Sequence, residues 1–550
     1  MKQRIPTRPA GPHTHPRQFI ISWAVALLIS PVVIPILFSL YIYRGIIRLL
    51  GKNSGLVGYL TPYDCIFAVD SYYTRPYASN LTILELKHRI DVQTIRRLFK
   101  SRILDNPSFS KLSCIPVEYA GYWFWKRIQV DLNASVTLFH DSELEHGEAD
   151  LDECLRRIVE MRYHNELFNV CLLNFGTRSY IVFRIHHTVC DGYSFNKLID
   201  VFVGLQSKYL VKSTNQQFNL LQFITSLLSE TIKWGKLIGN LPLHLCTLYK
   251  ESLTHTPNFY TLRKTSTTGQ IRRTVLPLSE IKTVRQITKS HFAAVGMSLM
   301  TGALQKLYDE VIPATSALRP ERLAIMHSLP KPNHPLTTLC NHWGVGLFKV
   351  PFTRDPVDRL IGAEHDFNEY LTLQFDRLLH LHIPIVGLAP CFIVKWFFSI
   401  NFGTSCGFTS VPGLFDKIAY VGDNTPGIDF GDGGFAEPNQ VEVTHMWKVF
   451  GLQWRQTAVA VAMYTYRGEA SVSMYANKDI VSDSKSMDRL MELFHEEFTE
   501  LVTHCNKRDE KISTTKLESR DVSPRSLQDH GLINGSSKFL NPCFRNNKLA

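Results

Sequence analysis

Residues 186–192, His-His-Thr-Val-Cys-Asp-Gly, join a predicted strand to a predicted helix and place imidazoles, a carboxylate and a glycine together. Residues 180–185 are β-branched and aromatic, which is typical of a strand that ends at the histidines. Residues 195–202 carry apolar side chains at helical spacing. A histidine at such a junction is held rigidly, reaches a cleft and can exchange a proton near neutral pH. The stretch predicts a basic imidazole on a loop that Asp191 braces and Gly192 keeps open.

Two other interpretations of this stretch are weaker. One is a coincidental pair of histidines that caps a buried strand. The other is a metal site formed by His187 and Cys190. A zinc site needs further ligands at short spacing, and no second pair follows nearby. The stretch therefore favours proton transfer over metal binding.

The N-terminal region contains a second strong signal. Residues 19–43 include no charged side chain and, as a helix, would extend about 37 Å, which is enough to cross a bilayer core. Pro31 and Pro35 lie inside the segment, so it is either a kinked single span or a re-entrant wedge. Basic residues flank both ends and leave the orientation open. We expect residues 1–56 to anchor the chain in the endoplasmic reticulum, or alternatively the plasma membrane, with the remainder facing the cytosol. A buried core helix is the other interpretation.

The charge balance limits the classes of partner. The chain has 60 Lys and Arg against 49 Asp and Glu, a net charge of +11, which suits an anionic partner such as coenzyme A or an anionic membrane surface. No zinc-finger spacing, stacking platform or helix-turn-helix pattern accompanies this charge, so we expect no nucleic acid partner. The 11 cysteines form no paired framework, as a reducing compartment permits.

The rest of the chain divides into two predicted lobes. Residues 57–210 alternate helical and strand segments, which predicts an α/β lobe that contains the histidines. Residues 211–270 are predicted as a crossover, and residues 271–505 as a second lobe that ends in a strand hairpin and a helix. Within it, residues 371–398 are apolar and helical, and they are either core or an interfacial helix. Residues 506–550 are polar and are predicted to be disordered.

The histidine stretch resembles the active-site motif of the coenzyme A-dependent acyltransferase superfamily. This superfamily includes chloramphenicol acetyltransferases, carnitine acyltransferases, peptide-synthetase condensation domains and wax ester synthases. The resemblance implies that His187 deprotonates the acceptor, that Asp191 is mainly structural and that Gly192 keeps a substrate tunnel passable. His186, His187 and Asp191 are therefore the candidate catalytic residues. The implied fold has two chloramphenicol-acetyltransferase-like α/β lobes with a cleft between them, preceded by a membrane helix.

Three further segments resemble one branch, the wax ester synthase/diacylglycerol acyltransferase family, in a membrane-anchored eukaryotic form. In chain order they are Leu60-Thr61-Pro62-Tyr63-Asp64, Asn341-His342-Trp343-Gly344 followed by Val350-Pro351, and Thr409-Ser410-Val411-Pro412-Gly413-Leu414. The chain departs from the family at Glu166-Leu167-Phe168 and at Gly296-Met297, where Pro-Leu-Trp and Asn-Asp blocks would fall. These departures affect the acceptor preference more than the fold.

The family resemblance also implies a reaction. The protein would be an O-acyltransferase that moves a fatty acyl group from acyl-CoA to a lipid hydroxyl. The acceptor would be a fatty alcohol, which gives a wax ester, or diacylglycerol, which gives triacylglycerol. Acyl-CoA would be a co-substrate, with no bound cofactor and no metal, and membrane lipid would be the other partner.

Two alternatives come from other functional classes. A serine esterase or lipase would use Ser405 in the Gly-x-Ser-x-Gly stretch at residues 403–407, with Asp423 or Asp429 and His445 following in the required order. A nucleophile elbow leads directly into a helix, and a Pro-Gly pair a few residues further on argues against one here. The other alternative is a lipid-binding protein with a catalytically inactive acyltransferase fold.

Overall fold

The structure is a computed structural model in which two units are distinguished, Met1–Cys505 and Asn506–Ala550. It describes residues 16–139, 148–205, 268–311, 320–330, 334–335, 338–373, 387, 389–399, 406–411, 413, 418–422, 440–451 and 457–518. The predicted crossover at 211–270 lies outside this set up to residue 267, as does Ser405.

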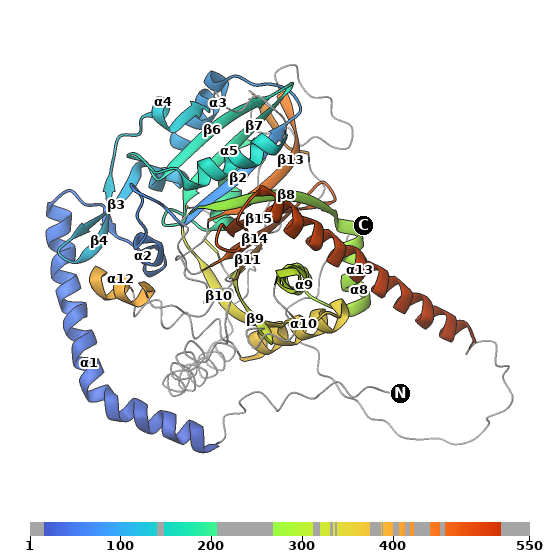
Figure 1. The fold of residues 1–550 in the computed structure, drawn as a ribbon. Coiled ribbons are helices and arrows are strands. Elements are labelled where there is room, and N and C mark those ends of the chain that lie inside the picture. The colour runs from blue at the N-terminus through green and yellow to red at the C-terminus, as the bar shows by residue number, and fades with distance from the viewer. Residues whose placement is uncertain are drawn as a thin grey trace, which may run out of the picture. The chain divides into compact units, whose positions relative to one another are not determined.

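The first large sheet (Figure 1) has six strands, and one of them, β7, ends at His186. Its order is β12 (Tyr420–Gly422), β13 (Gln440–Phe450), β2 (Ser79–Leu86), β7 (Arg178–His186), β6 (Phe168–Phe175) and β5 (Val136–Leu138). The central strands are antiparallel, and β7 is buried along nearly its whole length. The strand expected at residues 180–185 is confirmed.

Both faces of this sheet are covered, which explains why β2 and β7 are buried along nearly their whole length. On one face lie α3 (Val92–Phe99) and α6 (Gly192–Phe202), which share a core with β2, β6 and β7. On the other lie α5 (Glu148–Glu160) and residues of the second sheet. Asp91 caps α3, as the sequence predicts, because its side chain accepts from the backbone N–H of Thr94.

The second large sheet also has six strands. Its order is β10 (Trp343–Pro351), β9 (Arg322–Pro330), β11 (Cys406–Val411), β14 (Val459–Tyr466), β15 (Glu469–Asn477) and β8 (Gly269–Pro277). Helices α8 (Leu278–Thr288), α9 (Phe292–Val311), α10 (Pro356–Leu373) and α13 (Ser484–Glu518) accompany this sheet. The expected hairpin is confirmed: β14 and β15 pair across Arg467 and Gly468, which have φ of 49° and 79° as a tight hairpin turn requires.

The predicted second lobe contributes two strands to the first sheet, which the sequence did not predict. Strands β12 and β13 lie within the predicted second lobe, 271–505, yet β13 pairs with β2 of the first sheet. The chain then returns to the second sheet at β14. The ranges 57–210 and 271–505 stay predictions as domain limits. The chain therefore connects the two sheets in more than one place, and β13 lies next to β2, which separates it from the histidine strand β7.

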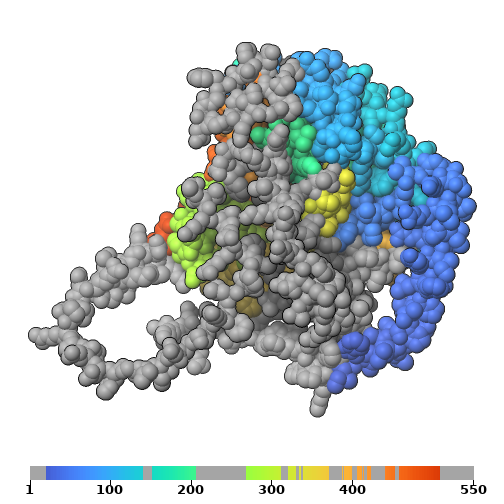
Figure 2. Space-filling model, turned by 180° about the vertical axis from the view of Figure 1, so that it is seen from behind, coloured from blue at the N-terminus to red at the C-terminus, as the bar shows by residue number. Residues whose placement is uncertain are grey.

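A third, smaller sheet carries the N-terminal helix. Its strands are β1 (Gly58–Tyr59), β4 (Tyr122–Arg127) and β3 (Cys114–Tyr119), and α2 (Pro62–Ala68) and α12 (Cys391–Ser399) pack beside it. The shorter elements η1 (Lys100–Leu104), η2 (Pro107–Ser113) and α4 (Leu132–Ser135) complete the described set. Helix α1 (Pro16–Asn53) runs through Pro31 and Pro35 without a break. It appears in dark blue in Figure 2.

One expectation near the C-terminus is wrong. The last helix was expected to end at residue 505, but α13 continues to Glu518, so the first part of the predicted disordered tail is helical. This stretch contains several Lys, Arg and Glu residues, which have a high intrinsic helix propensity. The apolar stretch 371–398 is described only in part, as the end of α10 and as α12 after Pro390.

Candidate active site

The histidine loop is built by the end of β7 and the start of α6. His187 follows the last residue of β7, and its backbone N–H donates to Ala78 O over 2.8 Å. Asp191 is the N-cap of α6, and its Oδ1 accepts from Ser194 N over 2.9 Å. An Asp at this position satisfies an N–H that the helix itself leaves free. The strand end and the helix cap therefore fix the short loop at both sides, as the sequence predicts.

The side-chain amide of Asn341, just before strand β10 of the second sheet, fixes the ring of His187. Its Nδ1 lies 3.1 Å from Asn341 Oδ1, and Asn341 Nδ2 donates to His187 O over 2.7 Å. Because a carbonyl oxygen only accepts, Nδ1 carries the ring hydrogen and donates it. Nε2 is therefore the unprotonated nitrogen of His187.

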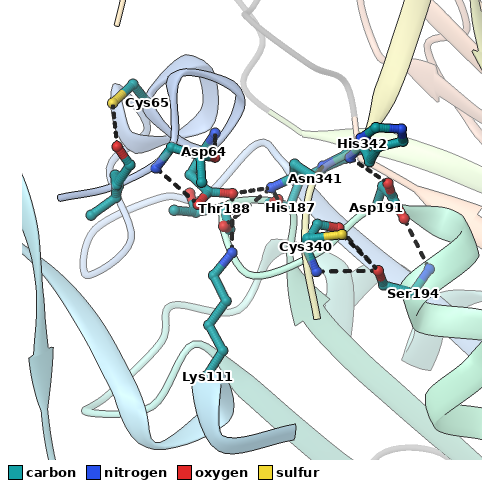
Figure 3. A network of polar contacts seen from close by, with 12 residues as sticks. Asp64, Cys65, Lys111, His187, Thr188, Asp191, Ser194, Cys340, Asn341 and His342 are labelled. Atoms are coloured by element: carbon teal, nitrogen blue, oxygen red, sulfur yellow. Dashed lines mark hydrogen bonds and ion pairs between the residues drawn. The ribbon is translucent and has the colours of Figure 1, made fainter. Parts of the chain in front are cut away.

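A buried carboxylate determines which way the Asn341 amide faces. Asn341 Nδ2 donates to Asp64 Oδ1 over 2.8 Å, and Lys111 Nζ reaches the same oxygen over 3.0 Å (Figure 3). Asp64 is fully buried and also belongs to a capping box with Thr61 at the start of α2. Since a carboxylate only accepts, the NH₂ group must face it and the Asn341 oxygen must face His187. Lys111, Asp64, Asn341 and His187 thus form one directed chain of hydrogen bonds.

Aromatic side chains complete the surroundings of His187. Phe67 of α2 stacks on the imidazole with ring centres 3.8 Å apart, and Trp343 lies edge-on at 5.9 Å. Burial lowers the pKa of His187 to about 4, although the Asp191 carboxylate acts in the opposite direction. The imidazole is therefore neutral at physiological pH, with a free lone pair on Nε2.

His186 has a different setting from its neighbour. It is completely buried, and Thr188 N donates to its Nδ1 over 3.2 Å. Its Nε2 therefore carries the hydrogen and donates to Asp70 Oδ2 over 3.0 Å. Asp70 in turn accepts from the backbone N–H groups of Tyr77 and Ala78. His186 does not belong to the wall of the cavity described below, so we assign it a positioning role rather than the catalytic one expected from the sequence.

Asp191 also holds the segment that carries Asn341. Its Oδ2 accepts from His342 N over 2.7 Å, its own N–H donates to Cys340 O over 3.1 Å, and His334 Nε2 lies 3.0 Å from Oδ2. Burial opposes ionisation of Asp191, but the His334 and backbone hydrogen bonds outweigh it and lower the pKa. Burial likewise opposes protonation of His334, but the bond to Asp191 raises its pKa to about 9. The two form an ion pair at neutral pH. Asp191 also helps to orient the His187 ring, because it fixes the backbone next to Asn341.

A cavity of about 850 Å³, including its open mouth, lies in front of His187. Its wall comes from both large sheets: the His187 loop and α6, β2 and β13 of the first, and β9, β10 and β11 of the second. Gly192 lines it, and a methyl group added there would come within 3.4 Å of Val411 on β11. Glycine therefore leaves the space between α6 and β11 free.

The alternative sites find less support. Among the described residues, no group of three or more His, Cys, Asp and Glu side chains is arranged to hold a metal ion, so His187 and Cys190 lack further ligands there. Ser405 lies outside the described residues, but the chain directly after it forms strand β11. A nucleophile elbow requires a helix at that point. His445 lies on β13 next to Glu469.

Several residues of the site escaped the sequence analysis. Asp64 and Asn341 stand in the segments that resemble the acyltransferase family, but nothing local indicated that they meet. Lys111, His334 and Phe67 lie in no motif. The only available signal was the Thr-Pro-x-Asp pattern at residues 61–64, which is typical of a capped helix start and says nothing of a partner far along the chain.

No protein-family model and no curated protein matches this sequence. Solved structures share its fold. The wax ester synthase/diacylglycerol acyltransferase from Marinobacter aquaeolei VT8 has a TM-score of 0.51 at 12% identity, over 82% of this chain and 99% of that one. The trichothecene 15-O-acetyltransferase from Fusarium sporotrichioides has a TM-score of 0.53 at 10% identity, over 81% and 94%. The starter condensation domain of rhizomide synthetase RzmA, in complex with C8-CoA and Leu-SNAC, has 0.50 at 8%, over 82% and 96%.

At these identities the likeness establishes the fold alone. The chain has the two-lobed α/β fold that these acyltransferases and condensation domains share, preceded by an apolar N-terminal helix. The fold class predicted from the sequence is confirmed. The activity of this chain depends on its own site.

Proposed function

We propose that this protein is an O-acyltransferase that moves an acyl group from acyl-CoA to a lipid hydroxyl. The acceptor is a fatty alcohol, which yields a wax ester, or diacylglycerol, which yields triacylglycerol. One observation carries the proposal: His187 is neutral, its Nδ1–H is held by Asn341, and its ring lines a cavity walled by both sheets. That arrangement suits a general base better than a metal ligand or a structural histidine.

The reaction follows from the free lone pair on His187. Nε2 removes the proton from the acceptor hydroxyl, and the oxygen attacks the thioester carbonyl of acyl-CoA. The tetrahedral oxyanion collapses, the new ester forms and the carbon–sulfur bond breaks. His187 then returns the proton to the departing thiolate, which leaves as free coenzyme A. No covalent acyl-enzyme is needed, and Asn341 holds the same tautomer throughout.

Two further observations support the acyl-CoA and the acceptor. The proteins that share the fold include an enzyme described as a wax ester synthase/diacylglycerol acyltransferase, and a condensation domain in complex with C8-CoA. The cavity is bordered by several aromatic and aliphatic side chains, among them Phe67, Leu329, Val411 and Phe450, which suit an alkyl chain.

We further infer that α1 attaches the enzyme to a membrane, where apolar acceptors are dissolved. Within the described residues, Ile20–Asn53 is long and apolar enough to cross a bilayer, with a mean hydropathy of 2.5 in its most apolar window. Side chains such as Leu28, Val32 and Phe38 are largely exposed, as expected for a helix that faces lipid. We place the anchor in the endoplasmic reticulum or the plasma membrane, with the catalytic lobes in the cytosol.

The direct test is transfer by the purified full-length protein. Radiolabelled acyl-CoA is incubated with a panel of fatty alcohols and diacylglycerols, and labelled ester and free thiol are both measured. The proposal expects one thiol released per ester formed, and ester formation lowered roughly 10²–10⁴-fold in the matched variant His187→Ala. Hydrolysis to free fatty acid, with no ester from any acceptor, would contradict acyl transfer and favour an esterase. Binding of acyl-CoA and lipid without turnover would favour the inactive alternative.

A further inference from the structure

One charged side chain of the cavity wall has no part in the proton transfer described above. Lys448 lies on β13, lines the cavity and is only 8% exposed. It stands directly opposite Thr82 in the β13–β2 pair, and its Nζ donates to Thr82 Oγ1 over 3.0 Å. This is the only hydrogen bond that Nζ makes within the described part of the chain. An amine offers two or three N–H donors, so donor capacity remains.

The surroundings of this amine are otherwise apolar. Nζ lies 4.8 Å from the ring centre of Phe195, which also lines the cavity, and 5.4 Å from that of Tyr464. No carboxylate of the described residues lies within ion-pair distance of Lys448, and Asp200 acts on it only from further away. Asp200 is itself unpaired at Oδ2, which is buried without a hydrogen bond. Among the described residues, the amine therefore has no ion-pair partner in direct contact, and only the more distant Asp200 opposes its charge.

The titration of the amine agrees with this geometry. Burial lowers the pKa of Lys448 to about 7, although Cys190 and Asp200 act in the opposite direction. Near neutral pH both forms of the amine are present, and each still offers an N–H donor. A polar donor left unpaired in an apolar site carries a free-energy penalty. An oxygen atom on the molecule that fills the cavity would remove that penalty, and a plain alkyl chain would not.

We propose that Lys448 Nζ donates a hydrogen bond to a substrate oxygen other than the reacting ones. The cavity thereby selects chains that carry a carbonyl, hydroxyl or carboxylate oxygen over plain alkyl chains. This inference rests on the proposed acyl transfer and names the residue that sets which chains the site accepts. The oxygen belongs to the acyl chain or to the acceptor, and the experiment below distinguishes these two sources.

The test compares matched substrates in the full-length protein. In the acyl arm, dodecanoyl-CoA is compared with its 12-hydroxy and 12-carboxy counterparts. In the acceptor arm, 1,2-dioctanoylglycerol, which has two ester carbonyls, is compared with the diether 1,2-dioctylglycerol. The variant is Lys448→Met, which keeps an unbranched apolar side chain about as long as the aliphatic part of lysine and removes the donor. The control is Lys87→Met, because that side chain is 57% exposed and lies just past the end of β2, beside Glu442.

In the wild type and in Lys87→Met, kcat/KM for the oxygen-bearing member of one arm should exceed that of its partner about 10-fold or more, as a hydrogen bond to a charged group would give. Lys448→Met should bring this ratio close to one, mainly through faster turnover of the plain chain. The arm that shows the effect identifies the source of the oxygen. Equal rates in both arms of the wild type, or a preference that survives Lys448→Met, would overturn the inference.

Two further measurements keep the inference separable from the proposed function. If no pair supports transfer, the proposed function fails, and calorimetric binding of the same ligands still tests Lys448. Tighter binding of the oxygen-bearing member by the wild type and not by Lys448→Met then supports the inference, and equal binding contradicts it. If Lys448→Met does not fold, Lys448→Gln takes its place, since it retains a shorter N–H donor and should reduce the preference only in part.

Discussion

The two neighbouring histidines occupy regions of opposite character, although they follow each other in the chain. His186 faces the core, carries its hydrogen on Nε2 and donates to Asp70. His187 faces the cavity, carries its hydrogen on Nδ1 and donates to Asn341. Alternation along a strand end turns one ring inward and the other outward. The comparison shows how one dipeptide supplies both a brace and a base, with the role of each ring set by its acceptor.

The acceptors themselves also differ. Asp70 lies on the same lobe as His186 and accepts mainly from nearby backbone N–H groups. Asn341 comes from far along the chain. Its orientation depends on the hydrogen bond to Asp64, which Lys111 also contacts, and on the hydrogen bond from His342 N to Asp191. The hydrogen bonds that fix His186 are therefore local, whereas those that orient His187 require both lobes to be assembled. Substitutions on the two sides should separate stability from activity.

The largest expected effect is at the base. His187→Ala should lower the rate of acyl transfer roughly 10²–10⁴-fold, because a general base contributes that much. The melting temperature and acyl-CoA binding should change little, since the ring fills only part of an open cavity. Single-turnover transfer and calorimetric binding measure the two quantities. A variant that binds acyl-CoA and turns it over at the wild-type rate would remove His187 from the mechanism.

Asp191 should affect stability most. Asp191→Ala leaves the protonated His334 without its partner and removes the cap of α6, so we expect a loss of about 3–5 kcal/mol in the free energy of unfolding. Activity falls as well, because the Asn341 segment is released. Asp191→Asn is the matched control, since it can still cap the helix and should lose less stability. Equal unfolding free energies for wild type and Asp191→Ala would contradict the stabilising role of these Asp191 contacts.

His186 should have the reverse profile of His187. His186→Ala removes a buried donor from Asp70 and should lower the free energy of unfolding by about 1–3 kcal/mol. Its kcat, measured on the folded fraction, should remain within a few-fold of the wild type. Chemical denaturation and active-site titration measure the two. A stable His186→Ala protein with no activity would show that the division between the two histidines is wrong.

Substitution of Asn341 should lower the rate by no more than substitution of His187 does, because Asn341 acts only by orienting that ring. Asn341→Ala frees the imidazole of His187 to rotate and change tautomer, and a misplacement of about 1 Å can lower a rate roughly 100-fold. The loss should appear in kcat rather than KM, because the amide is not part of the cavity wall. Asn341→Gln is the control that retains the amide but displaces it. A loss confined to KM would mean that Asn341 contacts substrate instead.

Local parts of the fold could be predicted from the sequence, and long-range parts could not. The strand before the histidines, the helix after them, the N-terminal helix and the closing hairpin all follow from patterns in consecutive residues. Placing β13 beside β2 could not be foreseen, because its pattern fits either sheet equally well. The same holds for the contact between Asp64 and Asn341. The residue that we propose as the base could therefore be named from a motif, but the residues that orient its ring could not.

The central claim is that His187, and not His186, is a base that stays neutral over the physiological range. The pH dependence of kcat/KM tests it most directly, because this quantity reports the groups of the free enzyme. Since burial lowers the pKa of His187 to about 4, the base is lost only when the pH falls through that value. We therefore predict no loss of kcat/KM at the ordinary histidine pKa near 6.5, and the same profile in His186→Gln and Lys448→Met. A fall to half centred near pH 6.5 that persists in Lys448→Met would contradict the account.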